Sequence, residues 1–341
     1  MTPNSTDRPL CVEAWREPVV ECVHLADAAV VDADGAVLAA HGDIDKAILP
    51  RSSIKALQAL PLVESGAAEA FALDDRALAL ACASHSGGPA HVALARDMLA
   101  AGGLGPDALG CGAHAPLGAP ERRALREAGG RPTPLHNCCS GKHAGMLLGI
   151  LHRGKAADGY LGRDHPYQVE VARALEETTG VPHPAHRAAI DGCSLPNHPI
   201  PLRALAGAFA RFGVDRLGGE GRAAATRRLR EACLRHPDLV AGEGRCCTDV
   251  MRALGGRAFV KVGAEGVYVA ALPEQGLGIA LKVRDGLREA GEIALVHLVS
   301  THLELDDTEQ AALAGWATQP IRNWRGVDTG RRRMTREDRA P

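Results

Sequence analysis

The chain has few aromatic residues, almost no net charge and no long hydrophobic run. Phe, Trp and Tyr make up 3% of its 341 residues, so a row of rings on which bases or sugars stack is not expected. The formal net charge is −2 at pH 7, which excludes the strongly basic surface typical of nucleic-acid-binding proteins. No uninterrupted apolar stretch reaches the roughly 20 residues that cross a bilayer. We therefore expect neither a nucleic-acid partner nor a membrane partner.

The N-terminal segment also lacks the apolar core of a secretion signal. Residues 1–9 are polar, and we expect a cytoplasmic protein. Ten cysteines are present. In a reducing compartment they are expected as free thiols or metal ligands rather than as a disulfide framework. With 46% hydrophobic residues, the chain can bury the core of one large domain.

Strand and helix patterns occur in blocks along the chain. Strand patterns at 18–41 and again at 258–284 flank a mostly helical stretch, 52–255. This order predicts an α+β fold in which the N-terminal and C-terminal strands form one antiparallel sheet, flanked by helices and joined to a helical region. We predict an N-terminal tail at 1–17, a single catalytic unit at 18–326 and a disordered basic tail at 327–341.

Ser52 and Lys55 form an S-x-x-K pattern at the start of an apolar run. Three residues apart on a helix, their side chains share one face. A lysine that burial or a second cation keeps neutral can take the proton of a nearby serine. The same spacing occurs in serine enzymes that form acyl intermediates. Because the pattern is short and recurs by chance, other residues must support it.

Two later segments follow the order found in those serine enzymes. Ser84 and His85 lie in a Gly-rich turn, which would display them on a loop. Lys261 and Gly263 lie at the end of a predicted strand, where backbone and ammonium can approach a substrate together. An S-x-x-K helix, a serine-bearing loop and a lysine-bearing strand occur in this order in β-lactamases and penicillin-binding proteins.

Cys139 and Cys193 lie in two separate turns, and two such thiolates, with Lys142 nearby, can hold a soft divalent metal ion. The chain has no C-x-x-C pair, and packing in the core is the commoner role of a cysteine. A cysteine nucleophile is the competing interpretation of the same residues. It would need a histidine partner, for which His143 and His85 are the nearest candidates.

Five segments, taken in order, resemble the rhizobial-type L-asparaginases, also called asparaginase II. The family is distinct from the threonine-dependent bacterial enzymes and from the self-cleaving plant-type enzymes. The resemblance extends from residue 18 to residue 326, where the chain reads Asn-Trp-Arg-Gly. The segments are Arg51 to Lys55, Ala83 to Gly87, Cys139 to Met146, Asp191 to Cys193 and Lys261 to Val267.

This resemblance implies a fold similar to serine β-lactamases, penicillin-binding proteins and glutaminases, and a homodimer. It implies an amidohydrolase that converts L-asparagine to L-aspartate and ammonia through a serine acyl-enzyme. Ser52 with Lys55 would form one serine–lysine pair. Ser84 with Lys261 would form the second.

The resemblance also assigns binding residues. The substrate would be bordered by Arg51, His85 and Gly263. A zinc ion close to the catalytic serines would be bound by Cys139, Lys142 and Cys193, with Asp191 behind them. A lysine binds zinc as the neutral amine, because the charge of the ion favours loss of its proton.

The sequence departs from the family pattern at two positions near these residues. Gly88 stands where a glutamate is expected after Ser-His-Ser-Gly, and Cys138 stands where an asparagine is expected. The Arg-rich end beyond residue 326 has no counterpart. Alternative functions are a β-lactam or peptide hydrolase on the same framework and a zinc-binding module without catalysis. Ser84 is the alternative nucleophile, and L-glutamine, one methylene longer, is the alternative substrate.

Overall fold

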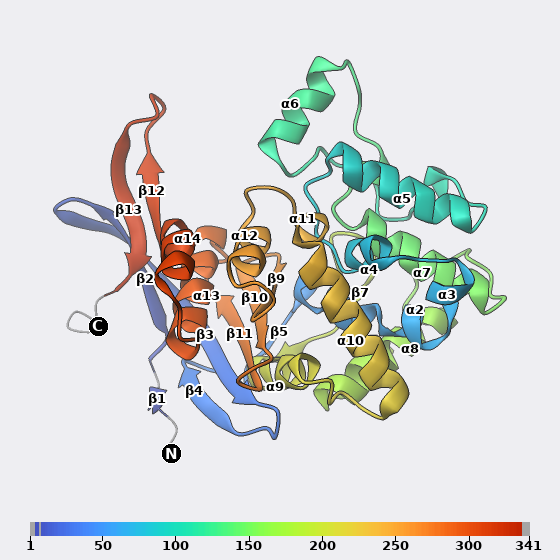
Figure 1. Cartoon of the computed structure of the whole chain (residues 1–341), viewed down its shortest axis with the longest axis horizontal. Helices are drawn as coiled ribbons and strands as arrows, with labels where there is room; N and C mark the ends of the chain where they lie inside the picture. Colours follow the sequence, from blue (N-terminus) through green and yellow to red (C-terminus); the bar gives the residue numbers. More distant parts are fainter. Residues whose placement is uncertain (1–3, 7, 336–341) are drawn as a thin grey trace. The chain divides into compact units, whose positions relative to one another are not determined.

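The computed structural model describes residues 4–6 and 8–335 (Figure 1). The chain divides into two compact units where a single unit was predicted. Unit 1 comprises residues 1–53, 200–214 and 249–341, and unit 2 comprises residues 54–199 and 215–248. Within the described residues, no helix combines the length and the hydrophobicity needed to cross a bilayer.

Unit 1 is built around a sheet that joins both ends of the chain. Its main strand order is β12-β13-β2-β3-β11-β10-β9, with β4 paired to β3 and β1 paired to β4. All of these pairings are antiparallel except that of β1 with β4. The strands are β1 (Asn4–Thr6), β2 (Leu10–Arg16), β3 (Val19–Asp32), β4 (Val37–His41), β9 (Phe259–Gly263), β10 (Val267–Leu272), β11 (Leu277–Val283), β12 (Thr318–Arg322) and β13 (Asp328–Met334).

The two predicted tails contribute strands to this sheet. β2 lies within the predicted N-terminal tail and β13 within the predicted C-terminal tail, and the two strands pair with each other. The Arg333 guanidinium lies 5.0 Å from the centroid of the Trp15 ring, so a basic residue packs on an aromatic ring here. The tail prediction is therefore wrong for 10–16 and 328–334. For residues 1–3, 7 and 336–341 it falls outside the residues that the structure describes.

Helices cover both faces of the central strands. α9 (Leu202–Gly213) packs so closely on one face that a Cβ at Gly278 would overlap the helix backbone. α13 (Arg288–His302) packs on the face that carries Tyr268, whose ring would lie 2.8 Å from a Cβ at Gly291. Burial on both faces explains why β10 and β11 read as continuous apolar runs in the sequence rather than as alternating ones.

The remaining elements of unit 1 are short or lie at its edges. A two-stranded pair joins β5 to β8. These elements are β5 (Ala47–Ile48), β8 (Ile200–Pro201) and α14 (Asp307–Ala317), while η1 (Arg51–Ile54) and α12 (Cys246–Ala253) each include residues of both units.

Unit 2 is the predicted helical region, packed around α7 (Ser140–His152). Residues 140–150 of this helix are all buried. Gly141 allows the close approach of α4, because a Cβ there would overlap the Leu80 carbonyl. The other elements are α1 (Lys55–Gln58), α2 (Leu60–Glu64), α3 (Ala67–Ala70), α4 (Asp75–Ala81), α5 (Pro89–Ala101), η2 (Pro106–Ala108), α6 (Ala119–Glu127), η3 (Pro134–His136), α8 (Pro166–Thr179), η4 (Ala185–Arg187), β6 (Ala189–Ile190), β7 (Pro196–Asn197), α10 (Glu220–Arg235) and α11 (Pro237–Val240).

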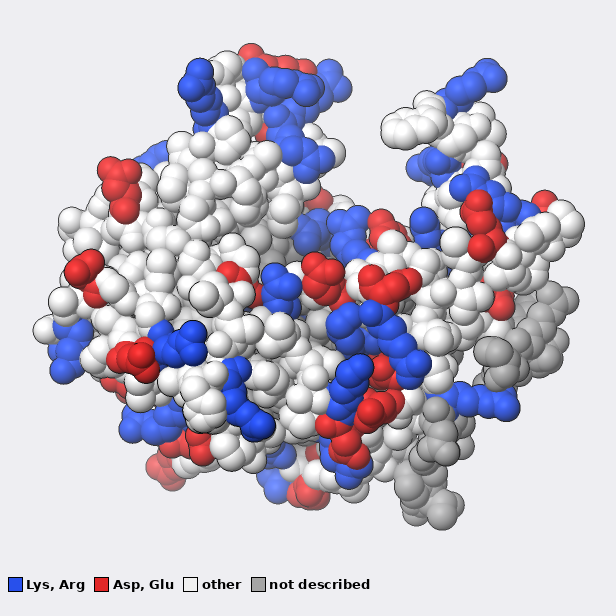
Figure 2. Space-filling view, turned by 180° about the vertical axis from the view of Figure 1, so that it is seen from behind, with Lys and Arg blue, Asp and Glu red and all other residues white. Residues whose placement is uncertain are grey.

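The predicted α+β class, with an antiparallel sheet, flanking helices and a helical region, is confirmed. On the face shown in Figure 2, Lys and Arg side chains are interspersed with Asp and Glu side chains. Arg222, for example, pairs with Glu64 at 2.5 Å and with Glu177 at 2.7 Å. On this face, the charged side chains are therefore of mixed sign.

His183 and His198 face each other inside unit 2. Their ring centroids are 4.9 Å apart, and both side chains are buried. Burial, followed by the charge that His198 would carry, lowers the pKa of His183 from 6.5 to about 4. The neutral ring is therefore favoured in the folded protein, and between pH 6.5 and 4 the unfolded chain binds more protons.

We expect the free energy of unfolding to decrease as the pH falls from 6.5 to about 4. Above pH 6.5 the His183 ring is neutral in both the folded and the unfolded chain, so its full contribution to the free energy of unfolding is present. The free energy of unfolding, measured with urea at pH 7 and at pH 5, should decrease less between these two pH values in His183→Gln than in the wild type. His186→Gln, at an exposed position, is the control. Equal pH dependence in all three proteins would contradict this assignment.

Candidate active site

Lys55 is the central side chain of the candidate site. It begins α1, directly after η1, and is completely buried. Its Nζ lies 2.5 Å from the Ala83 carbonyl oxygen, 3.0 Å from Ser84 Oγ and 3.1 Å from Cys139 Sγ. Three distant segments of unit 2 therefore meet at one amine.

These three contacts can be satisfied in both protonation states of the amine. As an ammonium, Lys55 donates to the carbonyl, the hydroxyl and the sulfur. As a neutral amine, it donates to Ala83 and Cys139 and accepts a hydrogen bond from the Ser84 hydroxyl. A proton can therefore pass between Lys55 and Ser84 without a change in the positions of the heavy atoms, which is what a general base with a relay partner requires.

The backbone holds the Ser84 loop in place on both sides. The Ser84 N–H donates to the Val240 carbonyl at 2.8 Å, and the His85 N–H donates to the Cys138 carbonyl at 3.2 Å. Because the second bond reaches the residue before Cys139, the loop is fixed relative to the start of α7. The serine hydroxyl and the cysteine thiol are thereby kept on the same amine.

His85 supports this loop with both ring nitrogens. Its Nδ1 accepts a hydrogen bond from the Gly87 N–H at 3.1 Å, so the proton lies on Nε2, which donates to Ser140 Oγ at 2.9 Å. Ser140 Oγ donates in turn to the Leu135 carbonyl at 3.0 Å. Burial, followed by the charges on His91 and Lys55, lowers the pKa of His85 well below 6.5. A substrate contact of His85 stays a prediction, and the structure shows it holding the loop.

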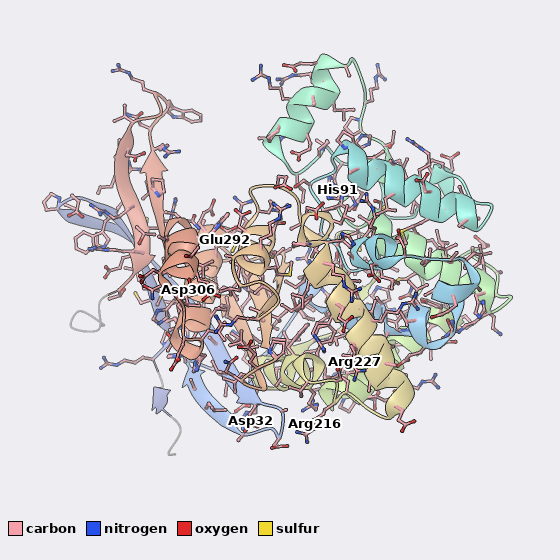
Figure 3. All side chains as sticks on the ribbon, viewed as in Figure 1. Asp32, His91, Arg216, Arg227, Glu292 and Asp306 are labelled. Carbon is pink, nitrogen blue, oxygen red and sulfur yellow. The ribbon has the colours of Figure 1, made fainter. Side chains whose placement is uncertain are left out.

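His91, which is labelled in Figure 3, packs against His85. The two rings are stacked with centroids 4.8 Å apart. His91 Nδ1 accepts from the Gly88 N–H at 3.2 Å, and its Nε2 donates to the Asp238 carbonyl at 3.0 Å. The sequence analysis missed both His91 and Ser140. The only signal for His91 was its position three residues after Gly88, where a helix-start side chain can turn back to the preceding backbone.

Cys139, Lys142 and Cys193 lie together, as the metal prediction requires. Lys142 Nζ donates to Cys193 Sγ at 3.1 Å, and the thiol of Cys193 is hydrogen-bonded to Cys139. α7 supplies two members of this set, since Cys139 precedes its first residue and Lys142 lies in its first turn. The Cys193 N–H donates to Asp191 Oδ1 at 3.1 Å, so Asp191 fixes the turn that carries the third member.

The two thiols differ in acidity. Hydrogen bonds from Cys138 and Cys193 lower the pKa of Cys139, and the shared bond raises the pKa of Cys193. Burial alone would lower the pKa of Lys142, but Cys193, Cys139 and Asp191 raise it above its usual value. Without a metal ion, these shifts favour a thiolate at Cys139, a thiol at Cys193 and an ammonium at Lys142.

The donor atoms of this set suit a zinc ion in type. Lys142 Nζ contacts Cys193 Sγ, the Cys193 thiol is hydrogen-bonded to Cys139, and zinc held by three protein ligands keeps a fourth position open to solvent or substrate. In the described part of the chain, no group of three or more His, Cys, Asp or Glu side chains suits a metal ion. Zinc binding here would therefore depend on Lys142 as the third ligand, after loss of its proton.

The histidines considered as partners of a cysteine nucleophile bind other groups. His143 Nδ1 lies 2.7 Å from the Tyr160 hydroxyl, and burial, followed by the charge on Lys142, lowers the pKa of His143 to about 3. His85 bonds to Gly87 and Ser140, as described above. The base in contact with Cys139 is Lys55, which favours lysine chemistry over a cysteine–histidine pair.

Other predicted site residues belong to unit 1, beginning with the η1 turn. Arg51 has a φ of 54°, a left-handed conformation that costs energy in a residue with a side chain. Ser52 follows it in the same turn. The next residue, Ser53, is completely buried and donates its hydroxyl to the Pro50 carbonyl at 2.8 Å. The turn is thus held by Ser53, and strain is concentrated next to Ser52.

The end of β9 lies against this turn. A Cβ at Gly263 would lie 2.6 Å from the Pro50 carbonyl oxygen and 3.3 Å from the Ser53 nitrogen, so the position needs glycine for close approach. Lys261, two residues earlier, is completely buried, and its Nζ donates to the Val262 carbonyl at 3.0 Å. Within unit 1, the end of β9 therefore lies against the turn that carries Ser52.

Comparison with known proteins identifies the family. The family model for L-asparaginase II matches residues 12–334. The chain belongs to the L-asparaginase II family. No curated protein matches it. Among solved structures, a β-lactamase from Mycobacterium bovis aligns with a TM-score of 0.39 and 16% identity, over 85% of this chain and 94% of that one; agreement this weak carries no weight for fold or function.

In this L-asparaginase II chain, the predicted site residues form two groups. Within unit 2, Lys55, Ser84 and Cys139 are in contact, and Lys142 and Cys193 adjoin them. Within unit 1, the Gly263 backbone meets the turn that carries Arg51 and Ser52. The predicted pairs of Ser52 with Lys55 and of Ser84 with Lys261 each join residues of different units, and they stay predictions.

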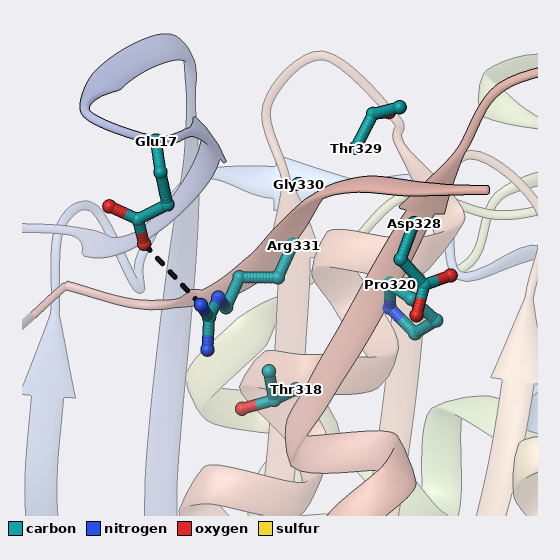
Figure 4. Close-up of a pocket in the computed structure, with 7 residues that line it drawn as sticks. All are labelled: Glu17, Thr318, Pro320, Asp328, Thr329, Gly330 and Arg331. Carbon is teal, nitrogen blue, oxygen red and sulfur yellow. Dashed lines mark ion pairs between the residues drawn. The ribbon is translucent and has the colours of Figure 1, made fainter.

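Unit 1 also has a pocket at the edge of its sheet (Figure 4). It has a volume of about 660 Å³, and Arg331 pairs with Glu17 across it at 3.5 Å. Its lining consists of Glu17, Thr318, Pro320, Asp328, Thr329, Gly330 and Arg331. None of the predicted catalytic residues contributes to this lining.

Proposed function

We propose that this protein is an L-asparaginase that hydrolyses the side-chain amide of L-asparagine to L-aspartate and ammonia. Membership of the L-asparaginase II family supports the activity. The observation that carries the mechanism is the 3.0 Å contact between Lys55 Nζ and Ser84 Oγ, two buried groups. A buried amine that can exchange a proton with a hydroxyl is the machinery of serine acyl transfer.

In the proposed acylation, Ser52 Oγ forms an ester bond with the side-chain carbonyl carbon, and neutral Lys55 takes the serine proton. Backbone N–H groups at the start of the helix stabilise the oxyanion. The carbon–nitrogen bond then breaks as the Ser84 hydroxyl protonates the nitrogen, which leaves as ammonia. Lys55 returns its proton to Ser84 across the observed contact.

Deacylation uses the same groups in the reverse sense. A water molecule gives one proton through Ser84 to Lys55 as its oxygen attacks the ester carbon. The ester bond breaks, L-aspartate is released, and Lys55 returns a proton to Ser52 Oγ. Lys261, the predicted partner of Ser84, would favour the anionic form of that hydroxyl during transfer.

Cys139, Lys142 and Cys193 are the residues that would hold a zinc ion. The bound ion would supply a divalent positive charge that keeps both sulfurs as thiolates. The chain itself couples this set to catalysis, because Cys139 Sγ contacts Lys55 Nζ at 3.1 Å. The set thereby fixes the position of the base. A homodimer and a cytoplasmic location complete the proposal.

An ammonia-release assay on L-asparagine and L-glutamine, before and after treatment with a chelator, tests the proposal. We expect release from L-asparagine, loss of activity with loss of zinc, and recovery on addition of zinc. The metal content of the purified protein should be one zinc per chain, retained in Cys22→Ser and lost in Cys193→Ser. Zinc binding without ammonia release would instead indicate a binding module. Hydrolysis of a chromogenic β-lactam would indicate the other hydrolase.

A further inference from the structure

Glu121 lies against the loop that carries Ser84, although the proposed mechanism does not use it. It belongs to the first turn of α6. A Cβ at Gly88 would lie 3.2 Å from Glu121 Cγ and 3.7 Å from its Oε1, and a Cβ at Gly118 would overlap its Oε2. The carboxylate therefore occupies the space between two glycines, one in the serine loop and one at the start of the helix.

The glycine at position 88 is explained by this carboxylate. Gly88 has a φ of −75° and a ψ of 169°, an extended conformation that any residue can adopt. The position therefore needs glycine for space rather than for backbone freedom, and Glu121 fills that space. The Gly118 N–H donates to the Ser86 carbonyl at 3.2 Å, so the start of α6 is fastened to the same loop.

Within residues 4–6 and 8–335, no hydrogen bond or ion pair engages the Glu121 carboxylate. A carboxylate at this helix position usually accepts from the backbone N–H at the helix start, but Gly118 gives that N–H to Ser86. His91, the nearest ring, uses one nitrogen to accept from Gly88 and the other to donate to Asp238. Apart from its electrostatic interaction with His91, the carboxylate is available to accept charge-assisted hydrogen bonds from a bound cation.

We propose that Glu121 binds the α-ammonium group of the substrate. This inference rests on the proposed function, because L-asparagine carries an ammonium group close to the amide that is cleaved. A carboxylate attached to the Ser84 loop would hold that ammonium while the amide is positioned for attack. It would make the enzyme select α-amino-acid amides over amides that lack the ammonium.

Succinamic acid provides the test, since it has the same terminal amide and carboxylate but no ammonium. Glu121→Gln should lower kcat/KM for L-asparagine by about 10- to 100-fold, mainly through KM, since a hydrogen bond to a charged group is lost. Its kcat/KM for succinamic acid should not change. Glu127→Gln is the matched control, because this carboxylate lies at the other end of α6 and pairs with Arg123 at 2.7 Å; it should leave both substrates unaffected.

A rescue variant separates binding from folding. The double variant Gly88→Glu/Glu121→Ala places a carboxylate in the same space from the serine loop itself. We expect it to prefer L-asparagine over succinamic acid more strongly than the single variant Glu121→Ala does. Equal losses on both substrates, no loss on either, or no rescue would overturn the inference and leave the proposed function intact. A folded wild-type protein that hydrolyses neither amide would refute the proposed function itself.

Discussion

Replacing Lys55 by methionine should lower kcat/KM for L-asparagine by at least about 10³-fold. Methionine keeps the length of the side chain and removes the amine, and the amine is the group that contacts Ser84 Oγ and Cys139 Sγ. In the proposed mechanism no other base accepts the proton of the attacking serine. The loss should appear in kcat, because the proton transfer occurs in the transition state and not in substrate binding.

The same substitution should also destabilise the fold. It leaves the buried Ala83 carbonyl without its 2.5 Å partner, and an unsatisfied buried group costs about 1–3 kcal/mol. Activity should therefore be measured well below the melting temperature, with circular dichroism to confirm folding. Lys155→Met, at an exposed position of the same unit, should retain both activity and stability. A folded Lys55→Met protein with near wild-type kcat would contradict the assignment of Lys55 as the base.

Replacing Ser52 by alanine should abolish turnover, whereas replacing its neighbour Ser53 should not. Ser52 is the proposed nucleophile, and removal of a nucleophile typically costs several orders of magnitude in kcat. Ser53 is buried and bonded to the Pro50 carbonyl, so Ser53→Ala should lose about 1 kcal/mol of stability and keep its kcat. The two variants differ only in which hydroxyl of one turn is removed.

To compare the variants, kcat is measured as steady-state ammonia release at saturating L-asparagine, and stability is measured by thermal unfolding of each variant. Turnover by Ser52→Ala together with inactivity of Ser84→Ala would move the nucleophile to Ser84. Equal loss in Ser52→Ala and Ser53→Ala, without unfolding, would show that the turn matters only as a structure.

The sequence predicted the strands that carry long apolar runs, and it missed β13, which carries none. β3, β10 and β11 carry long runs of Val, Ala and Leu that read as strands. β13 reads Asp-Thr-Gly-Arg-Arg-Arg-Met, which has no apolar alternation. Its place in the sheet comes from pairing with β2 and from contact of Arg333 with Trp15. Such contacts form only in the folded chain.

The individual contacts of the candidate site could not be predicted because they are tertiary. The order of the motifs grouped Ser52 and Lys55 with Ser84 and Lys261, and the family resemblance placed the cysteine set close to these serines. The structure joins the two sets through one atom, since Lys55 Nζ contacts both Ser84 and Cys139. Glu121 gave no signal, because a glutamate on a short, exposed helix reads as a solvated residue. Its contact with Gly88 spans 33 positions of the sequence.

The central claim is that Ser52 forms an ester with the substrate while Lys55 and Ser84 move protons. Acid quenching during turnover of L-asparagine, followed by peptide mass spectrometry, tests it directly. We expect an aspartyl group on the peptide that contains Ser52, assigned to that residue by fragmentation, present in Ser53→Ala and missing in Ser52→Ala. An aspartyl group on Ser84, Cys139 or Cys193 would contradict the account.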